Sequence, residues 1–261
     1  MADSLINRNF AHILIFCFMK KESTQWYSPT LDKDMPIITY GHYGFALLMV
    51  PTAGADYLEY ERFGLIDDLA PFIEAGKVKV YSVDSVNNES WMNKNIAPWE
   101  QAFRHDQWNE YIYNEVVPYI RNTSSWETPI IISGASFGAL HSMNLFLKRP
   151  ELLNGVIAMS GVYDLTYYSN GYMDGNVYFN SPQHYIPNLT DTEILNNNNK
   201  SGHIHILTGS GPYEDPAAGG NFAKLLYDKG INYEFDNWGP DYKHDWPTWR
   251  EMLPHYLATR F

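Results

Sequence analysis

Residues 129–147 constrain the possible folds more than any other part of the sequence. Residues 129–133 form a short run rich in isoleucine that predicts a buried strand, and residues 137–147 have the composition and spacing of a helix. Between them stands Gly134-Ala135-Ser136-Phe137-Gly138. Small residues beside the serine allow a strand and a helix to pass closely through a tight turn, which lifts the hydroxyl above the sheet edge. Ser136 is therefore the candidate nucleophile.

The rest of the chain alternates short apolar runs with amphipathic stretches. Strands are predicted at residues 36–40, 45–50, 78–83, 155–159, 203–208 and 232–238, and helices at residues 100–121, 217–228 and 246–257. Apolar strands that alternate with helices are typical of a mostly parallel sheet covered by helices on both faces. We therefore expect an α/β fold with one domain over residues 19–261, preceded by an N-terminal extension over residues 1–18.

One segment interrupts this alternation. Residues 164–200 are rich in Tyr, Asn, Gly and Pro and have no clear period, and the asparagine run 196–199 predicts a surface loop. A structureless loop of this length is unusual in a compact domain unless it has a function. We expect the segment to form the wall of a pocket or a lid.

Composition excludes several classes of protein. The formal net charge is −12, and no basic patch or stripe of the kind that binds nucleic acid is visible. Cys17 is the one cysteine, so no disulfide forms within the chain, and it lies away from every other motif. The nine histidines show no metal-binding spacing, so no metal or cofactor is expected.

An apolar run at residues 11–19 is too short to span a bilayer. Lys20-Lys21 follow it, and no cleavage site of small residues comes after it. We therefore predict a cytoplasmic protein that does not bind membranes.

A serine hydroxyl needs an adjacent base, and on a parallel sheet with this turn the chain order is Ser, then Asp or Glu, then His. His244 fits, because it follows the last predicted strand and precedes the last helix. The other candidates fit less well. His255 lies inside the last helix, His141 lies on the helix after the serine, and His203 and His205 precede the expected position of the acid.

The acid is expected in the loop after the strand at residues 203–208. Glu214 and Asp215 both stand there, and we prefer Asp215 because it precedes Pro216, which favours an extended backbone. Glu214 remains the alternative, followed by Asp236 and Asp241.

Two backbone N–H groups are expected to stabilise the oxyanion that forms when Ser136 attacks. One belongs to Phe137, at the start of the helix. We assign the second to Ala53, in a loop of small residues after an early strand, with its neighbour Gly54 as the alternative.

Four segments together resemble the putative esterase family of α/β-hydrolases, relatives of esterase D and of feruloyl and acetylxylan esterases. The segments are Pro51-Thr52-Ala53-Gly54, Glu89-Ser90-Trp91, Gly134-Ala135-Ser136-Phe137-Gly138, and His244-Asp245-Trp246 with Trp249. The resemblance implies an α/β-hydrolase fold, with Ser136, Asp215 and His244 as the triad. Many relatives carry His-Gly where Pro51-Thr52 stands here and have a shorter acid loop, so the second oxyanion donor and the choice of acid stay open.

These expectations define a serine carboxylesterase that hydrolyses short-chain, small-molecule esters through an acyl-enzyme. An acyltransferase, thioesterase or peptidase could use the same triad. A catalytically inactive hydrolase fold that serves as a binding module is the alternative from another class.

Overall fold

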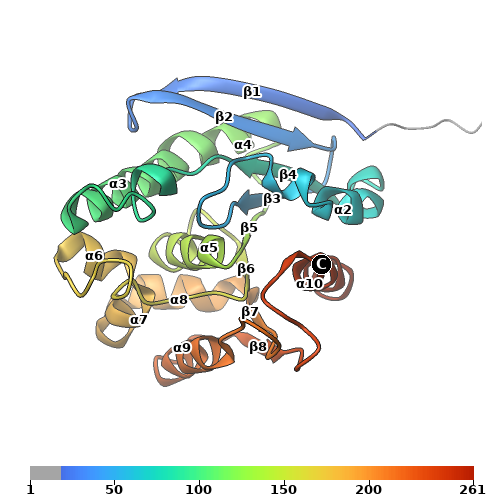
Figure 1. Ribbon diagram of the computed structural model, residues 1–261. Helices are drawn as coiled ribbons and strands as arrows, with labels where there is room; N and C mark the ends of the chain where they lie inside the picture. Colours follow the sequence, from blue (N-terminus) through green and yellow to red (C-terminus); the bar gives the residue numbers. More distant parts are fainter. Residues whose placement is uncertain (1–18) are drawn as a thin grey trace, which may run out of the picture.

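The computed structural model describes residues 19–261 and contains one eight-stranded sheet (Figure 1). The predicted extension and Cys17 lie outside the described residues. The strands have the spatial order β1-β2-β4-β3-β5-β6-β7-β8. Their bounds are β1 Lys21–Ser28, β2 Lys33–Tyr40, β3 Phe45–Val50, β4 Val78–Val83, β5 Ile130–Ala135, β6 Gly155–Met159, β7 Ile204–Thr208 and β8 Glu234–Asn237.

The sheet is mostly parallel, as the sequence predicts. Strands β3 to β8 all run parallel to one another, whereas β2 runs antiparallel to both β1 and β4. The interior strands from β3 to β7 are almost entirely buried, and most of their residues are apolar or small, with Lys79 on β4 and His205 on β7 as exceptions. Because parallel strands need crossover connections, helices cover both faces of this sheet.

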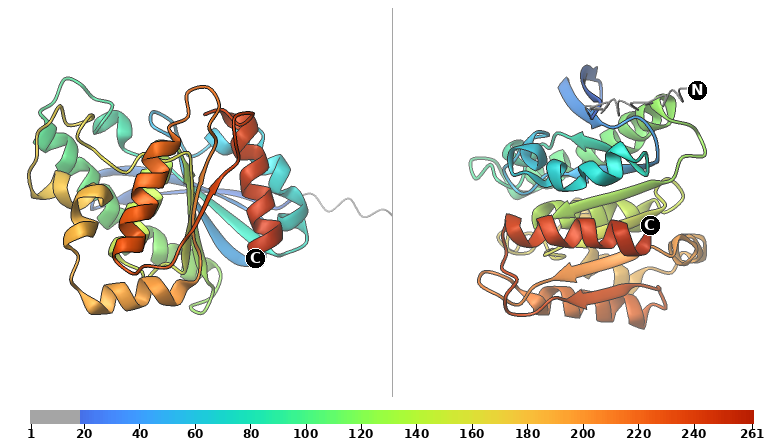
Figure 2. Two further views of the ribbon diagram at one scale, coloured as in Figure 1. Left: turned by 90° about the horizontal axis from the view of Figure 1, so that it is seen from below. Right: turned by 90° about the vertical axis from the view of Figure 1, so that its right-hand side faces the viewer.

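The helices form two layers (Figures 1 and 2). Helices α2 and α10 lie on one face, and α3, α5, α8 and α9 lie on the other. The bounds are α1 Glu59–Arg62, α2 Leu65–Glu74, α3 Pro98–Tyr111, α4 Val117–Thr123, α5 Phe137–Lys148, α6 Gly175–Asn180, α7 Pro182–Tyr185, α8 Thr192–Ser201, α9 Pro216–Asp228 and α10 Trp246–Arg260. The predicted α/β-hydrolase fold class is confirmed.

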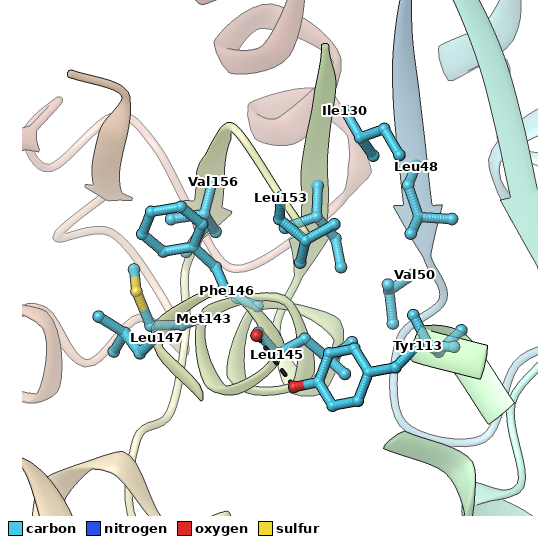
Figure 3. Close-up of a cluster of buried hydrophobic side chains, with 14 of the residues drawn as sticks. Leu48, Val50, Tyr113, Ile130, Met143, Leu145, Phe146, Leu147, Leu153 and Val156 are labelled. Atoms are coloured by element: carbon cyan, nitrogen blue, oxygen red, sulfur yellow. Dashed lines mark hydrogen bonds between the residues drawn. The ribbon is translucent and has the colours of Figure 1, made fainter. Parts of the chain in front are cut away.

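Helix α5 packs against the middle of the sheet and is buried along almost its whole length. Figure 3 shows its side chains beside residues from β3, β5 and β6. The hydroxyl of Tyr113 donates a hydrogen bond of 3.0 Å to the Leu145 carbonyl, which ties α5 to the helices that precede it (Figure 3). The start of α5, where Ser136 lies, is therefore rigidly placed.

Strand β1 was not predicted, because its sequence is polar. Lys21–Ser28 forms an edge strand that is exposed over most of its length. Glu115 holds it in place, because its carboxylate accepts hydrogen bonds from Trp26 Nε1 at 2.8 Å and Ser28 Oγ at 2.7 Å. A polar edge strand lacks the apolar pattern by which strands are recognised.

The predicted helix at residues 100–121 is interrupted. A π-helical turn, Ile112–Val116, separates α3 from α4. Pro118 follows that turn and has no N–H to donate to the carbonyl four residues earlier, which is a frequent cause of such a break.

The expectation of a structureless segment at residues 164–200 was wrong from residue 175 onward. Helices α6, α7 and α8 lie there, and the asparagine run belongs to α8 rather than to a loop. Asn199 joins α8 to the chain before β8, because its side chain donates to the Gly230 carbonyl and accepts from the Asn232 N–H at 2.9 and 2.7 Å. These tertiary hydrogen bonds offset the low helix propensity of asparagine.

Candidate active site

Ser136 stands on a strained turn between β5 and α5. Its φ is +56°, in the left-handed region that residues with side chains rarely adopt. Both flanking glycines are needed. A Cβ on Gly134 would lie 2.4 Å from the Gly138 backbone, and a Cβ on Gly138 would lie 2.5 Å from the Val50 carbonyl oxygen. The turn therefore presents the Ser136 hydroxyl at the carboxyl end of the sheet.

His244 reaches Ser136 from a loop 108 residues later in the chain. Its Nε2 lies 3.0 Å from Ser136 Oγ, within hydrogen-bond distance. The loop follows β8, and Asp245 caps the helix α10 that comes next by accepting a hydrogen bond from the Trp246 N–H. The predicted base and nucleophile are thus brought together.

Glu214 supplies the carboxylate behind this histidine. Its Oε2 lies 3.5 Å from His244 Nδ1, and its side chain is 1% exposed. Burial raises the pKa of Glu214, but hydrogen bonds with His244 and Ser160 outweigh burial, so the pKa lies below its ordinary value. The carboxylate is therefore ionised at neutral pH and can hold the imidazole in one tautomer.

Asp215, the preferred acid in the sequence analysis, lies elsewhere. Its carboxylate caps helix α9 by accepting hydrogen bonds from the Ala217 and Ala218 N–H groups at 3.1 and 3.2 Å. We therefore replace Asp215 by Glu214 in the candidate triad. Aspartate followed by proline is a common way to begin a helix, so Asp215-Pro216 carried a signal for the capping role.

Backbone hydrogen bonds join the loop that carries the acid to the loop that carries the histidine. Ser210 N–H donates to the Gly239 carbonyl, Gly211 N–H to the Tyr242 carbonyl, and His244 N–H to the Pro212 carbonyl, at 2.9 to 3.0 Å. The two loops approach so closely that a Cβ on Gly209 would lie 2.0 Å from the Tyr242 carbonyl oxygen. This contact fixes His244 relative to Glu214.

Ser160 and Trp249 complete the support of the acid, and Ser160 was not predicted. Ser160 follows β6 with a φ of +50°, and its hydroxyl donates to Glu214 Oε1. Trp249 Nε1 donates to Ser160 Oγ at 2.9 Å, and its ring meets the His244 ring edge-on at 5.2 Å. Trp249, the second tryptophan of the predicted histidine motif, therefore contacts His244 directly and supports Glu214 through Ser160.

The two residues predicted to donate to the oxyanion, Phe137 and Ala53, lie in or against the same apolar cluster. Phe137 is the first residue of α5, where an N–H has no partner within the helix. Ala53 packs against the same cluster as Phe137. Among the hydrogen bonds of the described residues, neither the Ala53 nor the Gly54 N–H has an acceptor. Both stay candidates for the second donor.

The remaining histidines lie away from Ser136. His141 is buried in a chain of hydrogen bonds, in which its Nδ1 lies 2.9 Å from His105 Nε2 and its Nε2 lies 2.9 Å from Asn87 Oδ1. Trp91 Nε1 donates to His105 Nδ1 at 3.0 Å, which fixes the direction of the chain. Burial lowers the pKa of His141 to about 3, so its ring is neutral. It contributes to packing rather than to the triad.

The arrangement of Ser136, His244 and Glu214 can activate a hydroxyl by removing its proton. Among residues 19–261, no group of three or more His, Cys, Asp or Glu side chains is placed to hold a metal ion. In the same part of the chain, no helix combines the length and apolar character needed to cross a bilayer.

A serine on a strained turn after a central parallel strand, with a carboxylate and a histidine from later loops, defines an α/β-hydrolase. The family described as "Putative esterase" matches residues 73–259 of this sequence. The chain belongs to that family, and it is an esterase-type serine hydrolase that acts on carboxylic esters.

Several solved structures have a similar fold. A ferulic acid esterase has 15% sequence identity and a TM-score of 0.70, with 92% of this chain and 96% of that chain covered. An S-formylglutathione hydrolase from Agrobacterium tumefaciens has 14% identity and a TM-score of 0.70, with 92% and 94% covered. The fluorophosphonate-binding serine hydrolase FphF of Staphylococcus aureus has 16% identity and a TM-score of 0.65, with 92% and 97% covered. No curated protein sequence matches the chain.

Proposed function

We propose that the chain is a serine carboxylesterase that hydrolyses short-chain esters through Ser136, His244 and Glu214. The observation that carries this proposal is the distance of 3.0 Å between Ser136 Oγ and His244 Nε2, with Glu214 buried behind the imidazole. A hydroxyl that is hydrogen-bonded to an oriented imidazole is the requirement for nucleophilic attack on an ester carbonyl.

In the first half of the reaction, Ser136 Oγ attacks the ester carbonyl carbon while His244 Nε2 takes the hydroxyl proton. The resulting imidazolium is stabilised by the Glu214 carboxylate on the opposite side of the ring. The tetrahedral oxyanion accepts hydrogen bonds from the Phe137 N–H and from the Ala53 or Gly54 N–H. His244 then gives its proton to the leaving alcohol, and the acyl group remains on Ser136.

In the second half, His244 removes a proton from water, which attacks the acyl-enzyme. The same oxyanion donors stabilise the second tetrahedral intermediate. Its collapse releases the carboxylic acid and returns the proton to Ser136 Oγ.

Small acyl groups are favoured by the packing next to the oxyanion donors. Ala53 and Tyr168 pack against the cluster that contains Phe137, and the Phe137 and Tyr168 rings lie 4.7 Å apart. Tyr168 belongs to the segment that the sequence analysis expected to form a pocket wall. A crowded wall supports acetate and other short acyl groups over long ones.

The experiment is a panel of p-nitrophenyl acetate, butyrate and octanoate with a thioester of acetate. We expect the rate to fall with acyl length, because Ala53 and Tyr168 pack beside Phe137 and leave little room for a long acyl chain. Ser136→Ala should remove turnover of every substrate while the thermal unfolding temperature stays near that of the parent. A variant that keeps most of the parent's activity would exclude Ser136 as the nucleophile.

A further inference from the structure

The loop that is expected to donate the second oxyanion hydrogen bond is fixed from several sides. The Tyr60 hydroxyl donates to the Val50 carbonyl at 2.6 Å, at the start of the loop. Two side chains from the segment after β4 hold the far end of the loop. Asn88 Nδ2 donates to the Gly54 carbonyl at 3.1 Å, and Ser85 Oγ donates to the Ala55 carbonyl at 3.2 Å.

Glu59 holds the middle of this loop. One carboxylate oxygen accepts a hydrogen bond of 2.9 Å from the Thr52 N–H, and the other accepts one of 2.6 Å from the Thr52 hydroxyl. Glu59 is 5% exposed, although it lies on a helix of only four residues. A buried carboxylate is costly unless its oxygens are hydrogen-bonded, and Thr52 provides two donors.

This contact determines which N–H groups of the loop remain available. Thr52 uses its N–H on Glu59, and Ala55 uses its N–H on the Thr52 carbonyl at 3.4 Å, which closes a turn. Ala53 and Gly54 occupy the centre of that turn, where N–H groups have no partner within the turn. Ala53 also contacts the apolar cluster that contains Phe137, the other expected donor.

We propose that Glu59 is a positioning residue for the oxyanion loop, and that it acts through Thr52. The two hydrogen bonds fix the Thr52 peptide, so the next N–H groups are oriented toward the oxyanion before substrate binds. Such preorganisation stabilises the transition state more than the bound ester. The inference rests on the proposed esterase function.

The test compares two pairs of variants with the parent. Glu59→Gln replaces one acceptor oxygen by an amide NH₂, which cannot accept a hydrogen bond from Thr52. Thr52→Val removes the hydroxyl and keeps the shape of the side chain, whereas Thr52→Ser keeps the hydroxyl. Glu61→Gln is the matched control, because Glu61 lies on the same helix and binds Lys21 and Tyr40 instead.

We expect Glu59→Gln to lower kcat for p-nitrophenyl acetate by about tenfold to a hundredfold, with KM changed by less than about threefold. The affinity for a trifluoromethyl ketone, which forms a tetrahedral oxyanion on serine, should fall by the same factor as kcat/KM. Thr52→Val should show part of this loss, and Thr52→Ser and Glu61→Gln should stay close to the parent.

The inference is overturned if Glu59→Gln and Thr52→Val both keep kcat and ketone affinity within about twofold of the parent. It is also overturned if kcat falls while ketone affinity does not, because the loss would then lie outside the oxyanion. If Glu59→Gln does not fold, the comparison of Thr52→Val with Thr52→Ser decides alone. A parent that hydrolyses none of the esters overturns the proposed function together with this inference.

Discussion

Two serines with left-handed backbone conformations lie at the ends of neighbouring strands. Ser136 follows β5 and carries the candidate nucleophile, while Ser160 follows β6 and binds the candidate acid. Such a conformation costs about 1–3 kcal/mol for a residue with a side chain and persists only where surrounding structure enforces it. Here the backbone N–H groups of Ser136 and Ser160 donate to carbonyls of the adjacent strands, Met159 and Leu207, at 2.9 and 2.7 Å. The Ser136 hydroxyl is thereby aimed at His244, and the Ser160 hydroxyl at Glu214.

The two adjacent carboxylates, Glu214 and Asp215, should respond differently to the same chemical change. We expect Glu214→Gln to lower kcat by about a thousandfold or more, because an amide stabilises neither the imidazolium nor the required tautomer. Asp215→Asn should keep kcat within about twofold, since asparagine caps a helix as well as aspartate does. Steady-state kinetics of both variants on p-nitrophenyl acetate measure the difference. The reverse pattern would return Asp215 to the triad.

The sequence predicted Ser136 and His244 because each stands in a local pattern with a recognisable place along the chain. The acid could not be predicted in the same way. Tyr213 has a φ of +66°, which turns the chain so that Glu214 points inward and Asp215 points out. The angle itself leaves no pattern in the sequence, and the one local signal was Asp215-Pro216, which marks the start of a helix.

At the scale of elements, the site depends on how closely β3, β5 and α5 approach one another. Gly138 lies where α5 passes the end of β3, and a Cβ there would meet the carbonyl oxygens of Val50 and Pro51 at 2.5 and 2.7 Å. Both carbonyls belong to the backbone, which has little freedom to move. The oxyanion loop begins at the same point, so this crossing sets the distance between the two expected oxyanion donors.

Gly138→Ala should therefore affect both stability and activity. We expect a loss of about 1–3 kcal/mol in the free energy of unfolding, because the added methyl overpacks a buried contact. The kcat should also fall, since Val50 and Pro51 must move and the loop after them moves too. Urea denaturation and ester kinetics measure the two effects.

Gly175→Ala is the matched control for this substitution. Gly175 begins helix α6, and a Cβ there would meet nothing within 4 Å. We expect this variant to be as stable as the parent or more stable by about 0.4–1 kcal/mol. If Gly138→Ala behaved like Gly175→Ala, the close approach of α5 to β3 would not matter for the site.

The strands whose bounds the sequence predicted correctly are buried on both faces. Strands β3, β4 and β6 match the predicted bounds, because continuous apolar runs leave little ambiguity. The elements that it missed are stabilised by distant partners. Strand β1 depends on Glu115, and α8 on hydrogen bonds from Asn199 to the chain near β8. Such partners are brought near only by the complete fold.

At the scale of the whole molecule, a chain of buried hydrogen bonds links three parts of the polypeptide. Trp91 and Asn87 lie after β4, His105 on α3 and His141 on α5. Burial lowers the pKa of both histidines, and that of His141 to about 3. In the unfolded chain, a histidine has a pKa of about 6.5. At pH values between about 3 and 6.5, His141 is therefore protonated in the unfolded chain but neutral in the folded protein.

Stability should therefore fall as the pH is lowered from 7 to 5. His141 alone is expected to lower the free energy of unfolding by about 2 kcal/mol. The reason is that pH 5 lies about 1.5 units below the pKa of histidine in the unfolded chain, and each unit costs about 1.36 kcal/mol. His141→Gln, which keeps an acceptor and a donor but does not titrate, should be less sensitive to pH. Urea denaturation at pH 7 and pH 5 measures the difference.

His255→Gln serves as the control for the pH experiment, because His255 lies exposed on α10. This variant should follow the parent at both pH values. An equal pH dependence in the parent and in His141→Gln would show that acid sensitivity comes from other groups.

The segment from Gly161 to His203 leaves the sheet at the end of β6 and returns at the start of β7. Because β6 and β7 are adjacent parallel strands, the segment can differ in length without altering the strand order. It nevertheless places Tyr168 against Phe137, beside the reacting centre. We expect that replacing this segment by one of another length or sequence would change which ester is accepted, and would leave Ser136, His244 and Glu214 in place, because none of the three belongs to it.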